Sequence, residues 1–521
     1  MPPLHLSVQD KPSIGVSLTY GFQQILLSIS GLLVYPYLLS EYLCAGEDKM
    51  SLRVQIISST FVASGAATLL QTTLGLRLSC FTGPAMAFLP PLIAFTKDHC
   101  DPKVHWKERL LQIEGSLFIA ALTYILLGAT GLASMLSSII GPITIVPLMV
   151  LLAASIVEPI EERLFLHWLS PIMLVVVIIL AVYLEDVYIR FPKYSFKKRE
   201  ILRTKVRIFG QFPYIISLLL MWIVCFILTI TGLEPMNGAA RTDSNASTLV
   251  LKEAPWFRVP HPGDYGMPTI NAGLCIAFIA SCIAGTIENL GSYEILARTS
   301  EQPSPPKHAV NRAILCEGLG TMLSSSLGLG AGVTTYTENI ALIQFTRVAS
   351  RCTMQAAGIV LICAGIFTKV AAILATIPEA LYGGILAMGA SIIAGVAFNN
   401  LQLIDLSLTR NLSIMGLSII IGLTIPTHIE KDPIHTGNKD FDEILNMLLK
   451  IKMLVGGIIA VFLDNTVPGG TKEQRGLIGK QSENYENSDI YNLPETIEQL
   501  IDTIRILRKL PFITPKRNVC I

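Results

Sequence analysis

The sequence predicts an all-α polytopic membrane protein, and three observations lead to this fold class. Of the 521 residues, 51% are hydrophobic and only 15% are charged, whereas soluble proteins carry about 25% charged residues. The mean hydropathy is +0.57. Apolar runs recur from about residue 17 to residue 464, without the alternation that is typical of an outer-membrane barrel. These features exclude a soluble enzyme, and the net charge of +1 does not favour a nucleic acid partner.

The apolar runs divide into fourteen predicted transmembrane segments. A helical crossing takes about 20 mostly apolar residues, and most of the runs are close to this length. The segments are expected at 17–39, 54–75, 80–95, 115–136, 140–157, 167–187, 213–232, 268–290, 313–329, 333–343, 354–376, 381–397, 411–427 and 449–464. The first ten residues are polar, so we expect no cleavable signal peptide.

Basic residues in the loops predict the orientation. Loop 189–212 carries eight lysines and arginines against one acid, Glu200. It is therefore expected in the cytosol, which places both termini there as well. The loop 233–267 then lies outside and carries a sequon that predicts glycosylation of Asn245. We expect the plasma membrane as the location.

Ten cysteines are scattered along the chain without a CxxC motif or zinc-finger spacing, so no metal site is predicted. Cys44 and Cys100 both fall in predicted outside loops. An oxidising compartment permits a disulfide between them.

The third and tenth segments are unlike ordinary membrane helices. Pro84, Pro90 and Pro91 interrupt the third, while Gly328, Gly330 and Gly332 precede a tenth segment rich in hydroxyls. Paired short, broken segments in corresponding halves are typical of transporters built from inverted repeats. The alternative is two helices that are kinked for packing alone.

Two acids within these apolar segments are the main candidate binding residues. Glu288 lies in the eighth segment, and Glu338 lies in the broken tenth segment. A carboxylate at membrane depth needs hydrogen-bond donors, a cation or a proton. The edge of a nucleobase offers adjacent N–H donors. The alternatives are a solvated helix end for Glu288 and an interfacial loop for Glu338.

Other polar residues give weaker indications. The amide of Gln24, in the first segment, can donate or accept. The hydroxyls of Thr334, Thr335 and Thr337 in the tenth segment are candidate sodium ligands. Most such hydroxyls, however, bond to helix carbonyls. On the link after the twelfth segment, Asp405 and Arg410 could be only a solvated ion pair beside Asn411. No P-loop, GxSxG or HExxH motif is present, which argues against an enzyme or an ATP-driven pump.

Residues 338–347, Glu-Asn-Ile-Ala-Leu-Ile-Gln-Phe-Thr-Arg, resemble the signature of the nucleobase–ascorbate transporters. That signature reads Gln, Glu or Pro, then Asn-x-Gly-x-x-x-x-Thr, then Arg, Lys or Gly. Residues 21–24, Glu288 with Gly291, 255–260, 400–412 and 463–469 resemble further elements of the family, the last three of its animal sodium-coupled branch. The resemblance extends from about residue 20 to residue 476.

The resemblance implies two inverted repeats of seven segments and a homodimer with an elevator-like cycle. A core domain would comprise 17–136 and 268–376, and a gate domain 137–235 and 377–466. The remaining parts are the N-terminus 1–16, the outside loop 236–267 and the cytosolic tail 467–521. The implied substrate-binding residues are Gln24, Ala85, Met86, Ala87, Phe88, Glu288, Ser292, Glu338 and Asn339. Thr346, Arg347, Asp405, Arg410 and Asn411 are assigned to gating or coupling.

Four positions depart from the family pattern. Gln24 replaces the usual His, Ser292 an Asp, and Ala341 a Gly, while 84–85 occupy the stretch where Ser is usual.

The predicted function is uptake of nucleobases of the uracil, hypoxanthine, xanthine or guanine class, coupled to sodium and without another cofactor. The alternatives are a sodium-dependent ascorbate transporter and a transport-inactive sensor. Ascorbate carriers of the family have Pro at the position of Glu338, so Glu338 favours a neutral ligand with N–H groups.

Overall fold

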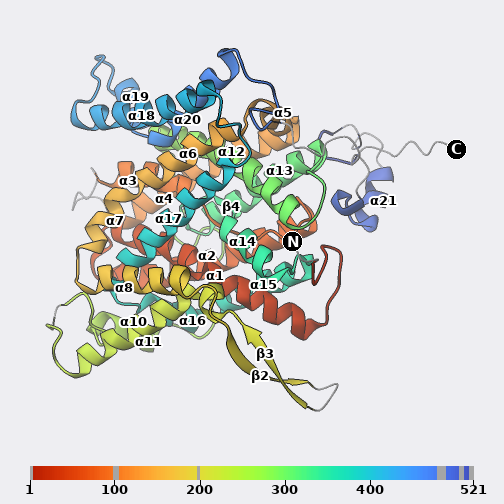
Figure 1. The fold of residues 1–521 in the computed structure, drawn as a ribbon. Helices are drawn as coiled ribbons and strands as arrows, with labels where there is room; N and C mark the ends of the chain where they lie inside the picture. Colours follow the sequence, from red (N-terminus) through yellow and green to blue (C-terminus); the bar gives the residue numbers. More distant parts are fainter. Residues whose placement is uncertain are drawn as a thin grey trace.

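The computed structural model describes residues 4–97, 105–195, 200–236, 238–477, 489–503, 508 and 510–514. Helices make up most of it (Figure 1). The elements of the first half are α1 (Ile14–Tyr42), α2 (Lys49–Thr73), β1 (Thr82–Pro84), η2 (Met86–Phe88), α3 (Leu89–Lys97), α4 (Trp106–Thr130), α5 (Leu132–Ile139), α6 (Pro142–Ser155), α7 (Val157–Leu164), α8 (Leu169–Ile178), β2 (Ile189–Ser195), β3 (Glu200–Val206), α9 (Ile208–Gln211), α10 (Pro213–Ile230) and α11 (Asn245–Glu253).

The second half repeats the pattern of long helices around a short strand. Its elements are α12 (Ala272–Thr299), α13 (Lys307–Ser326), β4 (Val333–Thr335), α14 (Thr337–Thr346), α15 (Arg351–Ile366), α16 (Thr368–Ala375), η4 (Glu379–Leu381), α17 (Tyr382–Leu401), α18 (Thr409–Lys431), α19 (Lys439–Leu449), α20 (Lys452–Thr466) and α21 (Glu495–Thr503). In Figure 1 α21 lies on the right, and α19 lies on the opposite side.

The helices pack in two groups that each combine segments from both halves. In the first group α1 and α2 pack against α15, and α4 packs against α12 and α13. In the second group α6 packs against α17, α18 and α20, and α8 packs against α10 and α17. The groups meet where α1 contacts α17 and where α12 contacts α6. Residues far apart in the sequence therefore build each group.

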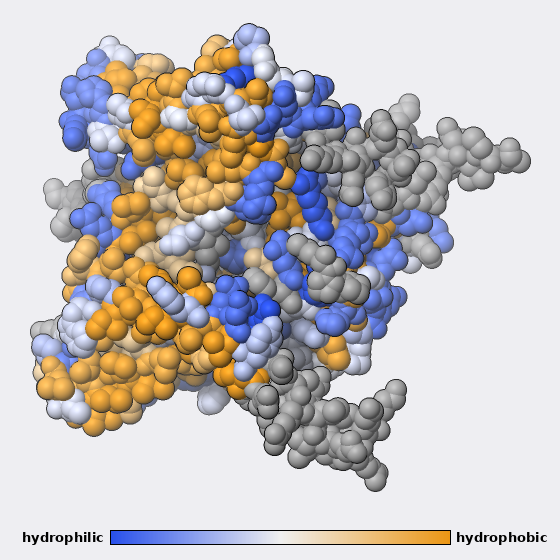
Figure 2. All heavy atoms as spheres, viewed as in Figure 1, coloured by the Kyte–Doolittle hydropathy of each residue, from blue (hydrophilic) through white to orange (hydrophobic). Residues whose placement is uncertain are grey.

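The protein is an all-α multi-pass membrane protein. Within the described residues, eight helices are long and apolar enough to cross a membrane, and α15 with α16, bent by 80°, gives a ninth candidate. Large apolar side chains point outward from these helices, including Ile420 (61% exposed) and Phe398 (60%). Figure 2 shows hydrophobic side chains over much of the visible face of the molecule, and hydrophilic side chains gathered toward the edges of that face. Such an outer surface matches lipid rather than water.

Each of the fourteen predicted segments contains helix, and the third and tenth are broken as expected. Strand β1 and the short helices η2 and α3 form the third, with Pro90 and Pro91 in the first turn of α3, where missing N–H groups cost least. Strand β4 and α14 form the tenth. The helical bounds differ from the apolar runs: α4 begins at Trp106 and α12 continues to Thr299, because polar turns extend both helices.

Candidate functional site

The two broken segments meet at the centre of the first group. Strand β1 pairs antiparallel with β4, and Gly83 lies opposite Thr334. The backbone N–H of Ala85 donates to the carbonyl of Gly332 (2.8 Å), and that of Tyr336 donates to Phe81 (2.9 Å). Extended backbone at membrane depth is tolerated only where its polar groups are satisfied or face a cavity. The hydrogen bonds between the two strands satisfy part of these backbone N–H and C=O groups and fix where η2 and α14 begin.

A cavity of about 620 Å³, its opening included, lies where the two groups of helices meet at these broken segments. Its walls come from α1, the β1–η2 turn, α12, the β4–α14 turn and α17. The lining residues are Ser30, Gly31, Val34, Pro84, Met86, Ile156, Glu288, Thr334, Thr335, Tyr336, Thr337, Glu338, Ile385, Leu386, Gly389, Ala390 and Ile393. The side from α17 is apolar, and the polar groups gather on the opposite side.

Glu288 and Glu338 supply the only charged side chains among the described residues of this lining. Among the described residues, neither carboxylate makes an ion pair or accepts a hydrogen bond from another side chain. Two carboxylates that face one cavity repel each other unless a proton, a cation or N–H donors intervene. The cavity is therefore built for a ligand that brings donors or positive charge.

The start of α14 adds hydrogen-bond donors to the cavity. The Ncap residue is Tyr336, whose side chain does not cap the helix. The first N–H groups of a helix have no intrahelical partner, and the dipole makes this end positive. A ligand here can thus meet carboxylate acceptors and backbone donors side by side.

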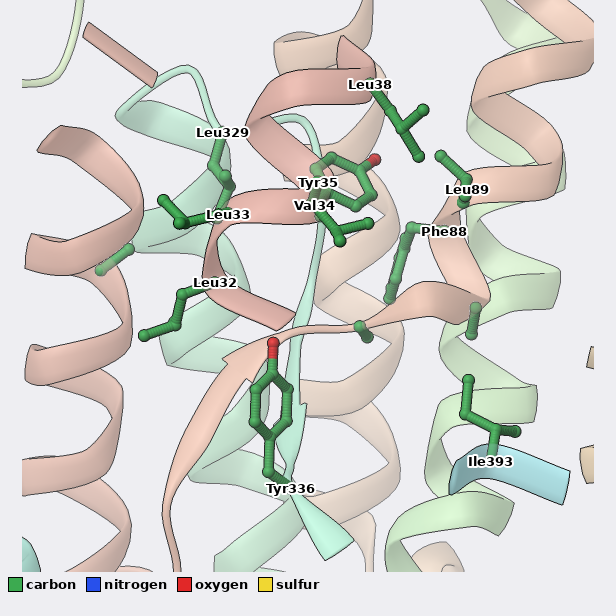
Figure 3. Close-up of a cluster of buried hydrophobic side chains, with 14 of the residues drawn as sticks. Leu32, Leu33, Val34, Tyr35, Leu38, Phe88, Leu89, Leu329, Tyr336 and Ile393 are labelled. Carbon is green, nitrogen blue, oxygen red and sulfur yellow. The ribbon is translucent and has the colours of Figure 1, made fainter. Parts of the chain in front are cut away.

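Tyr336 forms a wall of the cavity and fits between two glycines. Its hydroxyl donates to the carbonyl of Pro84 (3.1 Å). A Cβ atom would lie 2.9 Å from the Tyr336 ring at Gly31, and 2.5 Å from it at Gly83. In Figure 3 the Tyr336 ring stands below the α1 turns that carry Leu32 and Leu33, with Phe88 and Ile393 nearby. Only glycine at both positions leaves the ring this place.

A buried polar network supports the strand pair from behind, and its centre, Glu317, was not among the residues predicted from the sequence. This carboxylate accepts from the Tyr293 hydroxyl (2.7 Å), the Thr335 hydroxyl (3.2 Å) and the Gln71 amide (3.3 Å), and also from the Asn289 amide. Asn289 Oδ1 in turn accepts from the Thr334 hydroxyl (2.6 Å). An acid inside the apolar run 313–329 was the signal that could have indicated it.

The structure brings six of the predicted substrate or ion residues into the cavity lining. They are Met86, Glu288, Thr334, Thr335, Thr337 and Glu338. The hydroxyls of Thr334 and Thr335 are engaged by the network, but their oxygen atoms retain the ability to accept or ligate.

The other predicted substrate residues lie outside this lining. Gln24 Oε1 accepts from the Asn339 amide (2.7 Å), so both residues position α14 on α1. Ser292 donates to the carbonyl of Glu288 (3.1 Å). Ala85, Ala87 and Phe88 are buried beside β1, and the carbonyl of Ala87 accepts from Ser281 (2.8 Å).

Of the residues assigned to gating or coupling, Thr346 and Arg347 end α14. The Thr346 hydroxyl donates to the carbonyl of Leu342 (2.9 Å). Arg347 has a left-handed backbone (φ 57°) and pairs with Glu301. Its carbonyl accepts from His5 N–H (2.7 Å). These contacts fix the N-terminal segment to the first group.

Asp405 and Arg410 do not form the ion pair that was one interpretation of the sequence. Arg410 and Arg475 both bind the buried carboxylate of Asp464, at 3.2 and 2.9 Å. Asp405 instead accepts from the Ser407 hydroxyl (2.6 Å). Asn411 donates to the carbonyl of Gln474 (3.1 Å). The pairing was not visible in the sequence because Asp464 is distant along the chain.

Two predicted modifications concern the loops. Asn245 is exposed as the first residue of α11, which leaves the sequon accessible. Cys100, the predicted partner of Cys44, lies outside the described residues, so that disulfide stays a prediction.

A cavity between two helix groups, formed at paired broken segments in a multi-pass membrane protein, is typical of secondary transporters. The chain belongs to the xanthine/uracil permease family: the family model, described as a permease family, matches residues 15–431. Membership confirms that the protein is a transporter and not an enzyme.

Relatives match over nearly the whole chain. Solute carrier family 23 member 2 of Mus musculus is 34% identical over 516 residues, which is 94% of this chain and 79% of that protein. Nucleobase-ascorbate transporter 2 of Arabidopsis thaliana is 27% identical, over 91% of this chain and 90% of its own length. Among solved structures, the transmembrane domain of the cyanobacterial bicarbonate transporter BicA aligns with a TM-score of 0.45 and 13% identity, covering 86% of this chain and all of that one.

Proposed function

We propose that the protein takes up nucleobases together with sodium. The observation that carries this proposal is the pair of carboxylates, Glu288 and Glu338, which line one cavity without a cationic side chain among its lining residues. A purine or pyrimidine brings adjacent N–H donors, and two such donors can satisfy one carboxylate. Its carbonyl oxygens can accept from the N–H groups at the start of α14.

The apolar side of the cavity fits the faces of a planar ring. Ile385, Leu386 and Ile393 approach from α17, and the Tyr336 ring lies on the other side. Aromatic and aliphatic side chains are the usual walls for such a ligand. An anion such as ascorbate would meet two carboxylates and would need more cations or protons to bind.

The polar network beside the cavity supports the sodium part of the proposal. Sodium prefers oxygen ligands, and the strand pair offers the hydroxyl oxygens of Thr334 and Thr335 next to the Glu317 carboxylate. A cation here would also reduce the repulsion between the two cavity carboxylates. Sodium and substrate would then favour each other's binding, which is the requirement for coupled uptake.

We propose that the two helix groups are the core and gate domains that the family resemblance implies. We propose that the chain crosses the membrane fourteen times as two inverted repeats, and that the core moves against the gate in a homodimer. We further propose that both termini are cytosolic in the plasma membrane. The mixed composition of each group, with segments from both halves, supports the repeat arrangement.

One end of the core–gate contact carries a cluster of charges and rings, here named the latch (Tyr37, Glu41, Lys49, Arg53, Arg163, Glu379 and Tyr382). Lys49 Nζ lies 2.7 Å from a carboxylate oxygen of Glu379 in η4. Glu41 lies 2.8 Å from Arg53 of α2 and 3.7 Å from Arg163 of α7. The rings of Tyr37 and Tyr382 stack with centroids 3.4 Å apart. The latch joins the two groups at the end that the proposed orientation places outside.

The opposite end of the same contact is hollow. A second cavity, of about 1410 Å³ with its opening included, lies between the end of α12 and the end of α17. Its polar lining includes Glu294, Arg298 and Asn400. The outer end also holds a smaller cavity, of about 950 Å³ with its opening included, which is lined by Pro90, Ala94 and Glu158 among others. We propose that the latch at the outer end and the larger hollow at the inner end belong to an inward-facing state of an alternating-access transporter.

Ligand-dependent stability of the purified protein tests the proposal. Uracil, hypoxanthine, xanthine, guanine and ascorbate are each added in sodium and then in choline buffer, and Tm is measured. We expect a rise in Tm with a nucleobase, larger in sodium. Glu288→Gln should lose this rise, whereas Glu294→Gln, which is at the second cavity, should keep it. Stabilisation by ascorbate alone would contradict the nucleobase assignment, and stabilisation by none of the five would favour the transport-inactive alternative.

A further inference from the structure

A third cavity, separate from the substrate cavity, lies at the other end of α2 from the latch. It has a volume of about 500 Å³ with its opening included. Four segments enclose it: the chain before α1, the end of α2, the start of α15 and the tail before α21. The residues that matter for its chemistry are Lys11, Thr73, Arg77, Arg351, Gln355 and Pro494. In the proposed orientation this end faces the cytosol.

Three cations and no acid are found among the described residues that line this cavity. Lys11, Arg77 and Arg351 form no ion pair within the described part of the chain. One guanidinium nitrogen of Arg77 donates to the carbonyl of Thr73 (3.3 Å), while its Nε is buried and has no partner among the described residues. Partly buried guanidinium groups without an anion are costly.

A fourth cation lies directly behind the cavity. Arg312 is 4% exposed. Its Nε donates to the carbonyl of Gly75 (2.9 Å) and its Nη2 to that of Tyr491 (2.5 Å), but its Nη1 is buried without a partner among the described residues. Burial, together with the charges of Arg351 and Arg312, lowers the pKa of Arg77 to about 10.

Among the residues that the structure describes, nearby negative charge does not balance this cluster. Glu498 of α21 acts on Arg77 and Arg312 through space, but no ion pair joins it to either within the described residues. The start of α15 adds the positive end of a helix dipole. Its Ncap, Ser350, accepts from the N–H of Cys352 (3.2 Å). The side chains and the helix end therefore carry excess positive charge around an accessible volume.

We propose that this cavity binds a phosphate group, carried either by an anionic lipid headgroup of the cytosolic leaflet or by a soluble phosphate compound. Arginine guanidinium groups match the planar pairs of oxygens on a phosphate, and a phosphate monoester brings up to two negative charges to a site where three or four positive charges meet. The Gln355 amide and the threonine hydroxyl can complete its hydrogen bonds.

A bound phosphate would add one more connection between four segments of the chain that meet at this cavity. Lys11 precedes α1, Arg77 follows α2, Arg351 begins α15, and Pro494 begins the segment of α21. All but the tail belong to the first helix group. Binding would thus stabilise that group and hold the tail against it, without contact with the substrate cavity.

The test uses the full-length protein in nanodiscs. One arm compares phosphatidylcholine discs with discs that also contain phosphatidylinositol 4,5-bisphosphate. The other arm adds inositol hexakisphosphate or ATP to phosphatidylcholine discs. Binding and Tm are measured for the wild type, for Lys11→Gln/Arg351→Gln, and for Lys472→Gln, which removes an exposed tail lysine.

We expect one arm to raise Tm, and the double variant to bind that probe about tenfold more weakly or worse, because it loses two charge-assisted partners. Lys472→Gln should bind like the wild type. Stabilisation confined to the lipid arm assigns a headgroup, and stabilisation confined to the soluble arm assigns a soluble phosphate. If the double variant does not fold, Lys11→Gln alone should weaken binding. No binding in either arm, or equal binding by all variants, would overturn the proposal. None of these outcomes depends on the transported substrate.

Discussion

Four hydrogen bonds converge on the buried carboxylate of Glu317, and the substitution Glu317→Gln probes them directly. Two come from Tyr293 (2.7 Å) and Thr335 (3.2 Å), and two from the amides of Gln71 (3.3 Å) and Asn289. A glutamine keeps the shape of the side chain but turns one acceptor into a donor. At least one of the amide donors then loses its partner and faces another N–H.

The cost follows from these contacts. A hydrogen bond to a charged group contributes about 1.5–3 kcal/mol, and a buried donor left unpaired costs about 1–3 kcal/mol. We therefore expect Glu317→Gln to lower the free energy of unfolding by about 3–5 kcal/mol. Because Thr335 belongs to β4, the loss should also loosen the strand pair that shapes the substrate cavity.

Thermal unfolding of the purified protein is the assay. The matched control is Glu294→Gln, the same substitution at a site that is 29% exposed and paired with Arg298; it should cost less than about 1 kcal/mol. Glu317→Gln should lower Tm by several degrees more than Glu294→Gln does. Equal Tm values for the two variants would refute the view that the network around Glu317 supports the site.

Three further predictions concern the cavity, the latch and the outside loop. Glu338→Gln removes a charged acceptor and should weaken substrate affinity by about 1–3 kcal/mol, or roughly 5–150-fold; half-saturation of uptake measures this, and an unchanged value would remove Glu338 from the site. Lys49→Gln and Glu379→Gln should each loosen the latch and raise labelling from outside of an Ala94→Cys reporter, beside Glu158, by up to about fivefold, since a partly exposed pair contributes about 0.2–1 kcal/mol. The double variant should raise the labelling by less than the product of the two single effects, and fully multiplicative effects would show that the pair does not act as a latch. Asn245→Gln should abolish a glycan shift on gels in a glycosylating host, whereas the same shift in the variant would mean that Asn245 carries no glycan.

The sequence predicts the broken segments because their causes are local. Proline and glycine interrupt the apolar runs at residues 80–91 and 328–337, and within these stretches β1 and β4 are extended instead of helical, as expected from the backbone preferences of proline and glycine. The hydrogen-bond partners of the backbone groups in these segments were not predictable. The partner of Thr82 is Thr335, and no local rule relates two strands so distant along the chain.

In the candidate site, too, some residues could be predicted from the sequence while their contacts could not. Glu288 and Glu338 could be selected because a carboxylate within an apolar run needs an explanation. Glu317 satisfies the same criterion, yet its importance depends on donors from Gln71 and Asn289, which only the packing of α2, α12 and α13 brings together. Gln24 is a predicted substrate residue because residues 21–24 resemble a family element, and its hydrogen bond to Asn339 could not be inferred without the contact between α1 and α14.

Uptake of radiolabelled uracil and hypoxanthine by cells that express the protein tests the central claim most directly. The measurement is made in sodium and in choline, with unlabelled ascorbate as a competitor and with surface expression quantified. The account predicts sodium-dependent uptake that ascorbate does not reduce and that Glu288→Gln abolishes at normal surface expression. Ascorbate-sensitive uptake, or no uptake by protein present at the surface, would contradict it.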